Sequence, residues 1–364
     1  MGVSGALISS RMMYTLSRMV GESDPARQPA IDGRGSGGTT SKRIVVLATG
    51  GTIATTTDRT TGHSSPTLGA RVADAVDVEG IELSVEEASQ VASWRLEPDD
   101  MARIALRAAT LADTPGVDGV VITHGTTTLE YTAFLADLVH RADTAVVLTG
   151  AMRRADDPRP DGPANLRDAV LVAAAEEARG LGAVVVFAGR ILGAGRVWKA
   201  NRSEVDAFVD LSGRDVGRIR DGVVEILDRP VRPQPFSGRL DTRVRLVKLV
   251  PGADGAEIDA AAARDVRGLV VEALPGSGGV PPRALEALRA AASRIPVVIA
   301  SRAPFGDQPA APTGGTGEPL ADVPLLSAGS LSAEQAWLLL MLVLGETTRF
   351  DEASRKRFEA IARR

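Results

Sequence analysis

The amino-acid sequence predicts an α/β fold in two domains, a larger N-terminal domain with a mostly parallel sheet flanked by helices and a smaller C-terminal α/β domain. Three observations support this prediction. Short apolar runs alternate with helical stretches from Arg43 onward. The runs are continuously apolar, which is typical of strands buried on both faces of a parallel sheet. The chain has 364 residues, more than the roughly 150 residues of a typical domain.

Each predicted element follows from its local pattern. In the N-terminal half, apolar runs predict strands at 43–49, 119–123, 145–150 and 183–187, and periodic segments predict helices at 68–76, 128–140 and 163–178. In the C-terminal half, strands are expected at 243–250, 268–274 and 296–301, and helices at 256–264 and from Pro281. The last helix should begin at Ser332, because Gln335 three residues later fits a capping box.

Two segments that lack apolar runs set the expected domain boundaries. Residues 21–42 are rich in Gly, Ser, Thr, Pro and charge, so we expect 1–42 to be a disordered tail. Residues 228–242 carry three prolines and little apolar content, which indicates an extended linker. We therefore expect an N-terminal domain at 43–228, a linker at 229–242 and a C-terminal domain at 243–364.

Composition argues against several classes of function. A net charge of −4 provides no strong field for phosphate backbones or anionic lipids, so neither a nucleic-acid nor a membrane partner is expected. The absence of cysteine excludes thiolate sites, and the three histidines lack metal-ligand spacing, so we expect no metal. The first 20 residues interrupt their apolar character with Ser, Arg and Tyr, unlike a signal peptide or a span. A cytoplasmic location is therefore expected.

The first candidate motif is ATGGTIA, residues 48–54, directly after the first strand. Loops at the carboxyl ends of parallel strands line ligand sites. The pair Gly50-Gly51 lets the backbone approach a ligand and aim its N–H groups at negative charge. Thr52 then stands where its hydroxyl can attack a carbonyl. The alternative is a tight turn in which Thr52 only caps the next segment of the chain.

The second candidate motif is GVVITHGTTTLEYTAFLADLV, residues 119–139, which again predicts a strand, a polar loop and a helix. Thr126, Thr127 and Thr128 precede the helix, whose N-terminal N–H groups and dipole favour a substrate carboxylate. The alternative is that Thr126 or Thr127 is simply the N-cap of the helix.

Together the two motifs resemble the two signature segments of the bacterial type L-asparaginase family. Residues 150–169, GAMRRADDPRPDGPANLRDA, resemble a third segment, and the likeness extends over about 43–364 through GRVWKANRSEVDAF (195–208) and GSLSAEQA (329–336). The resemblance implies an amidohydrolase of small linear amides that needs no cofactor, most simply one that converts asparagine to aspartate and ammonia. It also implies a homodimer or homotetramer, because the family completes each site with loops from a neighbouring C-terminal domain.

Carried over by position, the resemblance assigns three catalytic residues. Thr52 is similar to the threonine that attacks the amide and forms an acyl-enzyme. Thr126 and Lys199 resemble the pair that activates the attacking group and handles protons. Lys199 can do so only if desolvation or nearby positive charge lowers its pKa. The alternative is a solvated lysine at a strand end.

The resemblance also assigns residues to substrate binding. The expected substrate-binding residues are Gly51, Ser93 and Thr127, and an ordinary loop serine is the alternative for Ser93. Ser277 and Glu318 fall loosely near positions that the family fills from a partner subunit. His124 is expected to be a buried, hydrogen-bonded histidine rather than a base.

Two departures from the family pattern affect the expected substrate. The family has aspartate where this chain has Thr127, and that aspartate faces the ammonium of a free amino acid, so its loss removes a hydrogen bond of about 1.5 to 3 kcal/mol. The family's loop tyrosine has no counterpart in residues 55–70, where Ser64, Ser65 or Thr67 is an alternative hydroxyl. Two further readings stay open, namely an N-blocked amide or lactam as substrate, and a ligand-binding protein without turnover.

Overall fold

The computed structural model describes residues 41–51, 53, 55–57, 64–66, 76–263, 265–276, 279–306, 320 and 322–364. The predicted tail lies outside these residues except for its last two positions, and Lys42 already belongs to the first strand. The helix predicted at 68–76 also lies outside them, apart from Val76.

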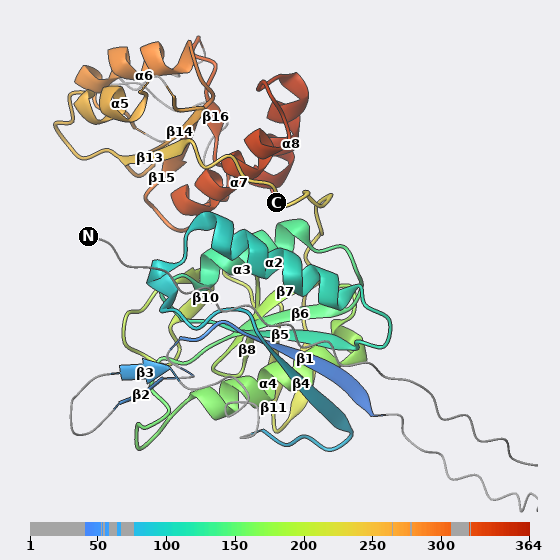
Figure 1. Cartoon of the computed structure of the whole chain (residues 1–364). Coiled ribbons are helices and arrows are strands. Elements are labelled where there is room, and N and C mark those ends of the chain that lie inside the picture. Colours follow the sequence, from blue (N-terminus) through green and yellow to red (C-terminus); the bar gives the residue numbers. More distant parts are fainter. Residues whose placement is uncertain are drawn as a thin grey trace, which may run out of the picture. The chain divides into compact units, whose positions relative to one another are not determined.

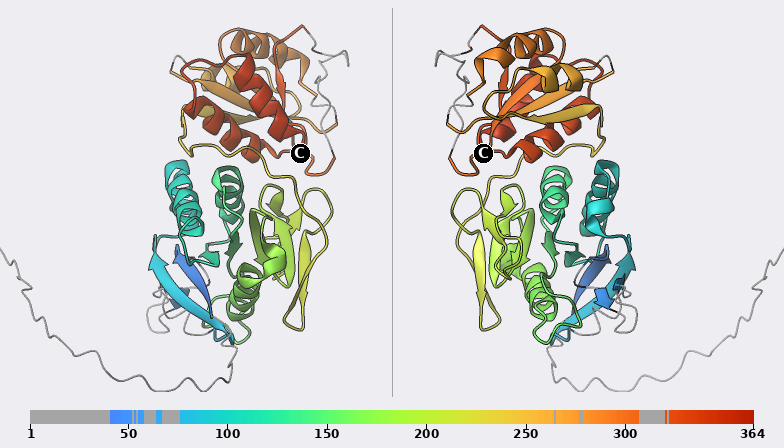
Figure 2. Two further views of the ribbon diagram at one scale, coloured as in Figure 1. Left: turned by 90° about the vertical axis from the view of Figure 1, so that its right-hand side faces the viewer. Right: turned by 90° about the vertical axis from the view of Figure 1, so that its left-hand side faces the viewer.

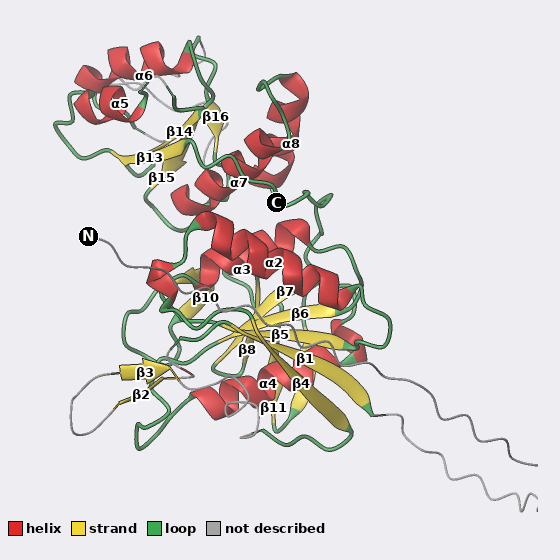
Figure 3. Ribbon diagram, in the orientation of Figure 1, coloured by secondary structure: helices red, strands yellow, loops and turns green. Residues whose placement is uncertain are grey.

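The N-terminal half is built on an eight-stranded sheet (Figures 1 and 3). Its strands are β1 (Lys42–Ala48), β4 (Ile81–Glu87), β5 (Gly119–Thr123), β6 (Ala145–Thr149), β7 (Ala183–Phe187), β8 (Arg190–Gly193), β11 (Gly217–Arg220) and β12 (Val223–Ile226). Their order across the sheet is β12-β11-β8-β7-β6-β5-β1-β4. The strands from β7 to β4 run parallel, as predicted, whereas β8, β11 and β12 add antiparallel pairs at the other edge.

Helices cover both faces of this sheet. The helices α2 (Pro98–Ala112) and α3 (Leu129–Val139) lie on one face, and α4 (Gly162–Ala174) lies on the other (Figure 1). Alternate residues of β1 enter different cores, since Val45 and Leu47 belong to the cluster of α2 and α3, whereas Ile44 and Val46 belong to that of α4. The continuous apolar run of β1 therefore reflects burial on both faces.

The C-terminal half contains a smaller parallel sheet of β13 (Val244–Lys248), β14 (Gly268–Ala273), β15 (Val297–Ser301) and β16 (Leu326–Ser327), in that order. One face is covered by α5 (Ala256–Ala261) and α6 (Leu285–Ala292), and the other by α7 (Ala333–Gly345), against which α8 (Glu352–Ala362) packs (Figure 2). The predicted capping box is present, because Ser332 Oγ accepts from Gln335 N at 3.2 Å and the Gln335 side chain accepts from Ser332 N at 3.1 Å.

The two halves share a core. Residues 227–243, which include the predicted linker, form no helix or strand. Leu338 and Leu342 of α7 belong to the same buried cluster as Phe134 and Leu135 of α3. No helix in the described ranges is long and apolar enough to cross a membrane.

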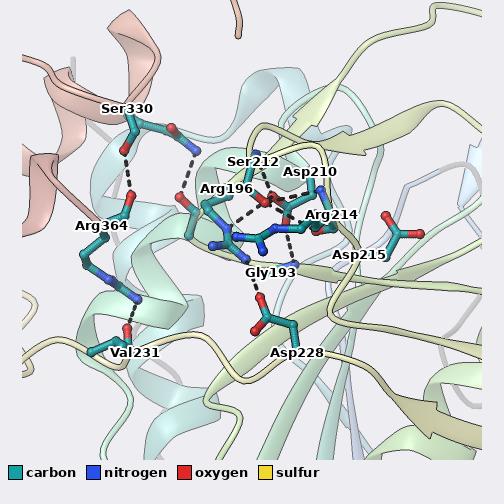
Figure 4. Close-up of polar contacts among 12 residues, drawn as sticks. Gly193, Arg196, Asp210, Ser212, Arg214, Asp215, Asp228, Val231, Ser330 and Arg364 are labelled. Atoms are coloured by element: carbon teal, nitrogen blue, oxygen red, sulfur yellow. Dashed lines mark hydrogen bonds and ion pairs between the residues drawn. The ribbon is translucent and has the colours of Figure 1, made fainter. Parts of the chain in front are cut away.

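Two short antiparallel pairs complete the fold. The first joins β2 (Thr55–Thr57) to β3 (Ser64–Pro66), and the second joins β9 (Val197–Lys199) to β10 (Phe208–Asp210). Lys199 is therefore the last residue of a strand. The start of β9 is fixed by ion pairing, because Arg196 Nε lies 3.1 Å from Asp210 Oδ1 while Asp210 Oδ2 accepts from Gly193 N at 3.2 Å (Figure 4).

Candidate active site

Three polar loops begin next to one another at the carboxyl ends of adjacent parallel strands. Ala48 of β1 is paired with Thr123 of β5, and Thr123 with Thr149 of β6. The pairing continues one residue further, where Thr49 N donates to Thr123 O at 3.1 Å and His124 N donates to Thr149 O at 2.8 Å. The two candidate motifs thus share the edge of the sheet at which α/β proteins bind ligands.

Glycines bring the backbones of these loops into contact. Gly51 has a φ of +91°, and a Cβ atom there would lie 2.5 Å from Gly125 Cα. A Cβ atom on Gly125 would lie 2.5 Å from Ser93 Oγ, and one on Gly150 would lie 2.4 Å from His124 O. The structure therefore brings the predicted residues Gly51 and Ser93 together at Gly125, a position that the sequence analysis did not single out.

The predicted Thr126–Lys199 pair is formed. Lys199 Nζ donates to Thr126 Oγ1 at 2.8 Å, although the two residues are 73 positions apart in the chain. Thr126 is 7% exposed, and burial lowers the pKa of Lys199 below its usual value. Lys199 is therefore partly buried, and its ammonium group donates to the Thr126 hydroxyl, while the catalytic role of the pair stays a prediction.

A carboxylate that the sequence analysis missed lies behind this pair. Glu130, in the first turn of α3, accepts a short hydrogen bond from the backbone N–H of Lys199. Burial raises the pKa of Glu130 to about 7, against the opposing effect of the Lys199 N–H, and the charge of Glu334 raises it further. No local signal could have identified this contact, because it depends on the packing of α3 against β9.

The threonine run does not cap the helix as the alternative reading expected. Thr128 occupies the N-cap position, and its hydroxyl donates to Ser93 O at 2.9 Å instead of capping the helix. The reading of Thr126 or Thr127 as a simple N-cap is therefore wrong. Thr127 is exposed, and its contact with substrate stays a prediction.

His124 is the buried, hydrogen-bonded histidine that the sequence predicts. Its Nδ1 lies 2.9 Å from Gly125 O and its Nε2 lies 2.9 Å from Thr132 Oγ1. Because a carbonyl oxygen only accepts, Nδ1 carries the proton and Nε2 accepts from the threonine hydroxyl. Complete burial lowers the pKa of His124 to about 4, so the ring is neutral at pH 7.

The third resembling segment shapes the loop beside the site. Asp161 accepts from Met152 N at 2.9 Å and from Arg153 N at 2.8 Å, and Asn165 Nδ2 donates to Gly150 O at 3.0 Å. A Cβ atom on Gly150 would lie 3.4 Å from Thr126 Cγ2. These side chains therefore hold the loop after β6 against the threonine.

The comparison with known families decides the identity. Residues 43–232 match the family described as Asparaginase, N-terminal, and residues 243–356 match the Glutaminase/Asparaginase C-terminal domain. The chain belongs to the asparaginase family. The resemblance stated from the two motifs is thus confirmed, as is the predicted fold, and the protein is an amidohydrolase that acts on linear amides.

Similar proteins cover most of this asparaginase chain. A probable L-asparaginase of Deinococcus radiodurans is 36% identical over 83% of this chain and 92% of its own length. L-asparaginase 2 of Bacillus subtilis is 33% identical over 84% of this chain and 83% of its own length. A probable cytoplasmic L-asparaginase from Campylobacter jejuni has a TM-score of 0.78 at 29% identity, covering 89% of this chain and all of that one. These relatives support an asparaginase function.

Several predicted residues of this asparaginase are not part of the described site. Thr52, Thr67, Ser277 and Glu318 lie outside the described residues, and only the backbone is described for Ser64 and Ser65. Within the described ranges, no three His, Cys, Asp or Glu side chains are grouped so that they could hold a metal ion.

Proposed function

We propose that this amidohydrolase converts free asparagine to aspartate and ammonia through an acyl-Thr52 intermediate. The observation that supports this most is the 2.8 Å contact between Lys199 Nζ and Thr126 Oγ1, next to the glycine loop that contains the candidate nucleophile. A lysine held on a threonine hydroxyl in a partly buried setting is the arrangement that activated nucleophiles require. A binding protein without turnover would not need this pair.

The reaction needs two proton transfers. The Thr52 oxygen attacks the side-chain carbonyl, its proton passes to the leaving nitrogen, and ammonia departs as the acyl-enzyme forms. Water then attacks the ester and loses a proton to the Thr126–Lys199 pair, which returns that proton to the Thr52 oxygen as the ester C–O bond breaks and aspartate leaves. Backbone N–H groups of the glycine loops are the donors for the oxyanion formed in each step. Lys199 must be neutral to accept a proton, and burial favours that state.

Substrate recognition is assigned to the loops around the same pair. We expect Gly51 and Ser93 to bind the substrate carboxylate, since Ser93 Oγ lies against Gly125. Thr127 takes the position at which the family has an acceptor for the substrate ammonium. Because a threonine hydroxyl supplies no charge there, an N-blocked amide or lactam is the second candidate substrate.

We also propose a homodimer or homotetramer located in the cytoplasm. Trp94 is 69% exposed and Val91 is 38% exposed, although their neighbour Ser93 is only 5% exposed. A contiguous exposed apolar patch marks an interaction surface, and we infer that these two side chains belong to one. Sedimentation velocity should give a mass of at least two chains, and a fully active monomer would contradict this assembly.

Ammonia release from asparagine, glutamine and N-acetylasparagine tests the proposed function. We expect asparagine to be the best of the three, and Lys199→Met and Thr126→Val to lower kcat by roughly 10²- to 10⁴-fold, the contribution of general base catalysis. Thr110→Val is the matched control, because Thr110 is an exposed helix threonine. Thr52→Ala should bind substrate without turnover.

The outcomes separate the candidates. Faster turnover of the acetylated amide than of asparagine would favour the N-blocked substrate. Retention of most of the wild-type rate by Lys199→Met would remove the Thr126–Lys199 pair from the mechanism. Saturable binding of asparagine with no ammonia from any amide would leave the binding protein as the conclusion.

A further inference from the structure

Within the described part of the chain, no acidic side chain acts on Lys199 from the threonine side. Its ammonium group donates to a neutral hydroxyl, Thr126 Oγ1, and the next position is another neutral threonine, Thr127. The Nζ atom also lies 5.9 Å from the centroid of the Phe208 ring, an apolar contact with weak cation–π attraction. The negative charge that acts on Lys199 comes from Glu130.

Glu130 reaches Lys199 through the backbone. It stands in the first turn of the helix that follows the threonine loop, and its Oε2 accepts from the N–H of Lys199. The same contact therefore fixes the end of β9 and places a carboxylate near the ammonium group. Since the threonine loop leads directly into α3, Glu130 ties both members of the Thr126–Lys199 pair to one rigid helix.

The two residues that lead into β9 are fixed independently of Glu130. Arg196 is paired with Asp210 at 3.1 Å (Figure 4), and Gln335 Nε2 donates to Gly195 O at 3.3 Å. These contacts hold the first residues of the segment. The last residue, Lys199, is held by α3, so a change at Glu130 acts at the reactive end of the strand.

Among the residues that the structure describes, three charged or titratable groups act on Glu130 or adjoin it. Lys199 faces it from β9, Glu334 acts on it from α7, and Tyr131 follows it on α3. Burial and Glu334 favour the protonated form of Glu130, whereas the Lys199 N–H and charge favour the carboxylate. Glu130 therefore stays protonated to a higher pH than an ordinary glutamate, and once ionised its charge opposes the loss of the Lys199 proton.

We propose that Glu130 is a positioning residue that holds Lys199 on Thr126 and sets the pH at which Lys199 becomes a base, in a chain that has threonine at the family's aspartate position. This inference rests on the proposed catalytic role of Lys199. The contact itself is independent of turnover, so the two can be tested separately.

Lysine NMR tests the coupling without requiring activity. The sequence contains four lysines, Lys42, Lys199, Lys248 and Lys356, so ¹³Cε-lysine labelling gives few signals and Lys199→Met assigns the one of interest. In the wild type, the curve of the Lys199 ¹³Cε chemical shift against pH should show a second inflection near pH 7 as Glu130 ionises. In Glu130→Gln, whose amide oxygen still accepts from Lys199 N, that inflection should vanish and the Lys199 midpoint should move to lower pH.

Kinetics give the second readout. Glu130→Gln should keep its KM for asparagine and move the acidic limb of the kcat/KM profile to lower pH, in the same direction as the NMR midpoint. Glu130→Ala, which also removes the acceptor, should lower kcat by roughly a hundredfold, the effect of misplacing a catalytic group by about 1 Å. The exposed Glu204→Gln is the matched control and should change neither quantity.

The results distinguish two kinds of failure. A wild-type Lys199 signal without an inflection near pH 7, or an unchanged midpoint in Glu130→Gln, would overturn the role of Glu130 whatever the activity. If Glu130→Gln fails to fold, the wild-type titration alone decides. If the NMR shifts appear but no amide is hydrolysed, the Glu130–Lys199 coupling stands and the proposed function fails.

Discussion

Acid should destabilise this protein through His124. The imidazole is fully buried, and burial lowers its pKa from 6.5 to about 4. The unfolded histidine takes up a proton below pH 6.5 while the folded one does so only near pH 4, so the free energy of unfolding falls as the pH drops through this window. Between about pH 7 and about pH 4.5, His124 contributes about 2 kcal/mol to this loss, at about 1.4 kcal/mol for each pKa unit.

Urea unfolding at the two pH values measures this loss. His124→Gln removes the titrating group, so its free energy of unfolding should fall by about 2 kcal/mol less than that of the wild type on acidification. Any effect of the substitution that is the same at both pH values cancels when the loss of the variant is subtracted from that of the wild type. Thr132→Val is the control, because it removes the hydroxyl that Nε2 accepts from but keeps the imidazole. Equal acid losses in the wild type and His124→Gln would refute the assignment of His124 as a buried neutral group.

Four further changes have defined outcomes. Glu130→Gln should increase the loss of unfolding free energy on acidification by about 2 kcal/mol in the same urea experiment. The Glu130 carboxyl, whose pKa is raised to about 7, binds its proton first in the folded state and so stabilises the fold as the pH falls. A smaller loss than in the wild type would contradict the burial of Glu130. Gly125→Ala should cost about 1 to 3 kcal/mol of unfolding free energy and most of the ammonia release, since its Cβ would lie 2.5 Å from Ser93 Oγ; full activity would disprove the close packing. Thr127→Asp should lower the KM for free asparagine by roughly one to two decades, whereas an unchanged KM would mean that this position does not face the substrate amine. Asn165→Ala should cost about 1 to 3 kcal/mol, because Gly150 O loses its donor; a loss below about 0.5 kcal/mol would show that the bond contributes little.

Local sequence patterns predicted the architecture because burial of a parallel sheet on both faces requires apolar residues along the whole of each strand. Val45 and Leu47 face one core while Ile44 and Val46 face the other, which is why the run reads as uninterrupted apolar sequence. The antiparallel edge was harder to predict. Strands such as β11 and β12 are only partly buried and contain arginine and glutamate, so they lack the apolar signal.

In the candidate site, only residues at positions of the family's sequence motifs could be predicted. Thr126 and Lys199 were paired from their resemblance, and the structure brings them to hydrogen-bonding distance. Glu130 could not be found in this way, because a glutamate in the first turn of a helix is ordinarily explained by the helix dipole. Its burial depends on β9, whose Lys199 lies 69 residues further along the chain.

The contact between Gly51 and Gly125 restricts how this protein can change over evolution. A side chain at either position meets main chain or the Ser93 hydroxyl at 2.5 Å, and Gly51 also has a positive φ. Main-chain atoms cannot be made smaller by substitution elsewhere, so no second mutation can create space for a side chain at Gly51. In a selection of double mutants, no second mutation should therefore restore the stability lost when Gly51 is replaced. In the apolar cores, by contrast, a smaller neighbouring side chain can compensate for a larger one.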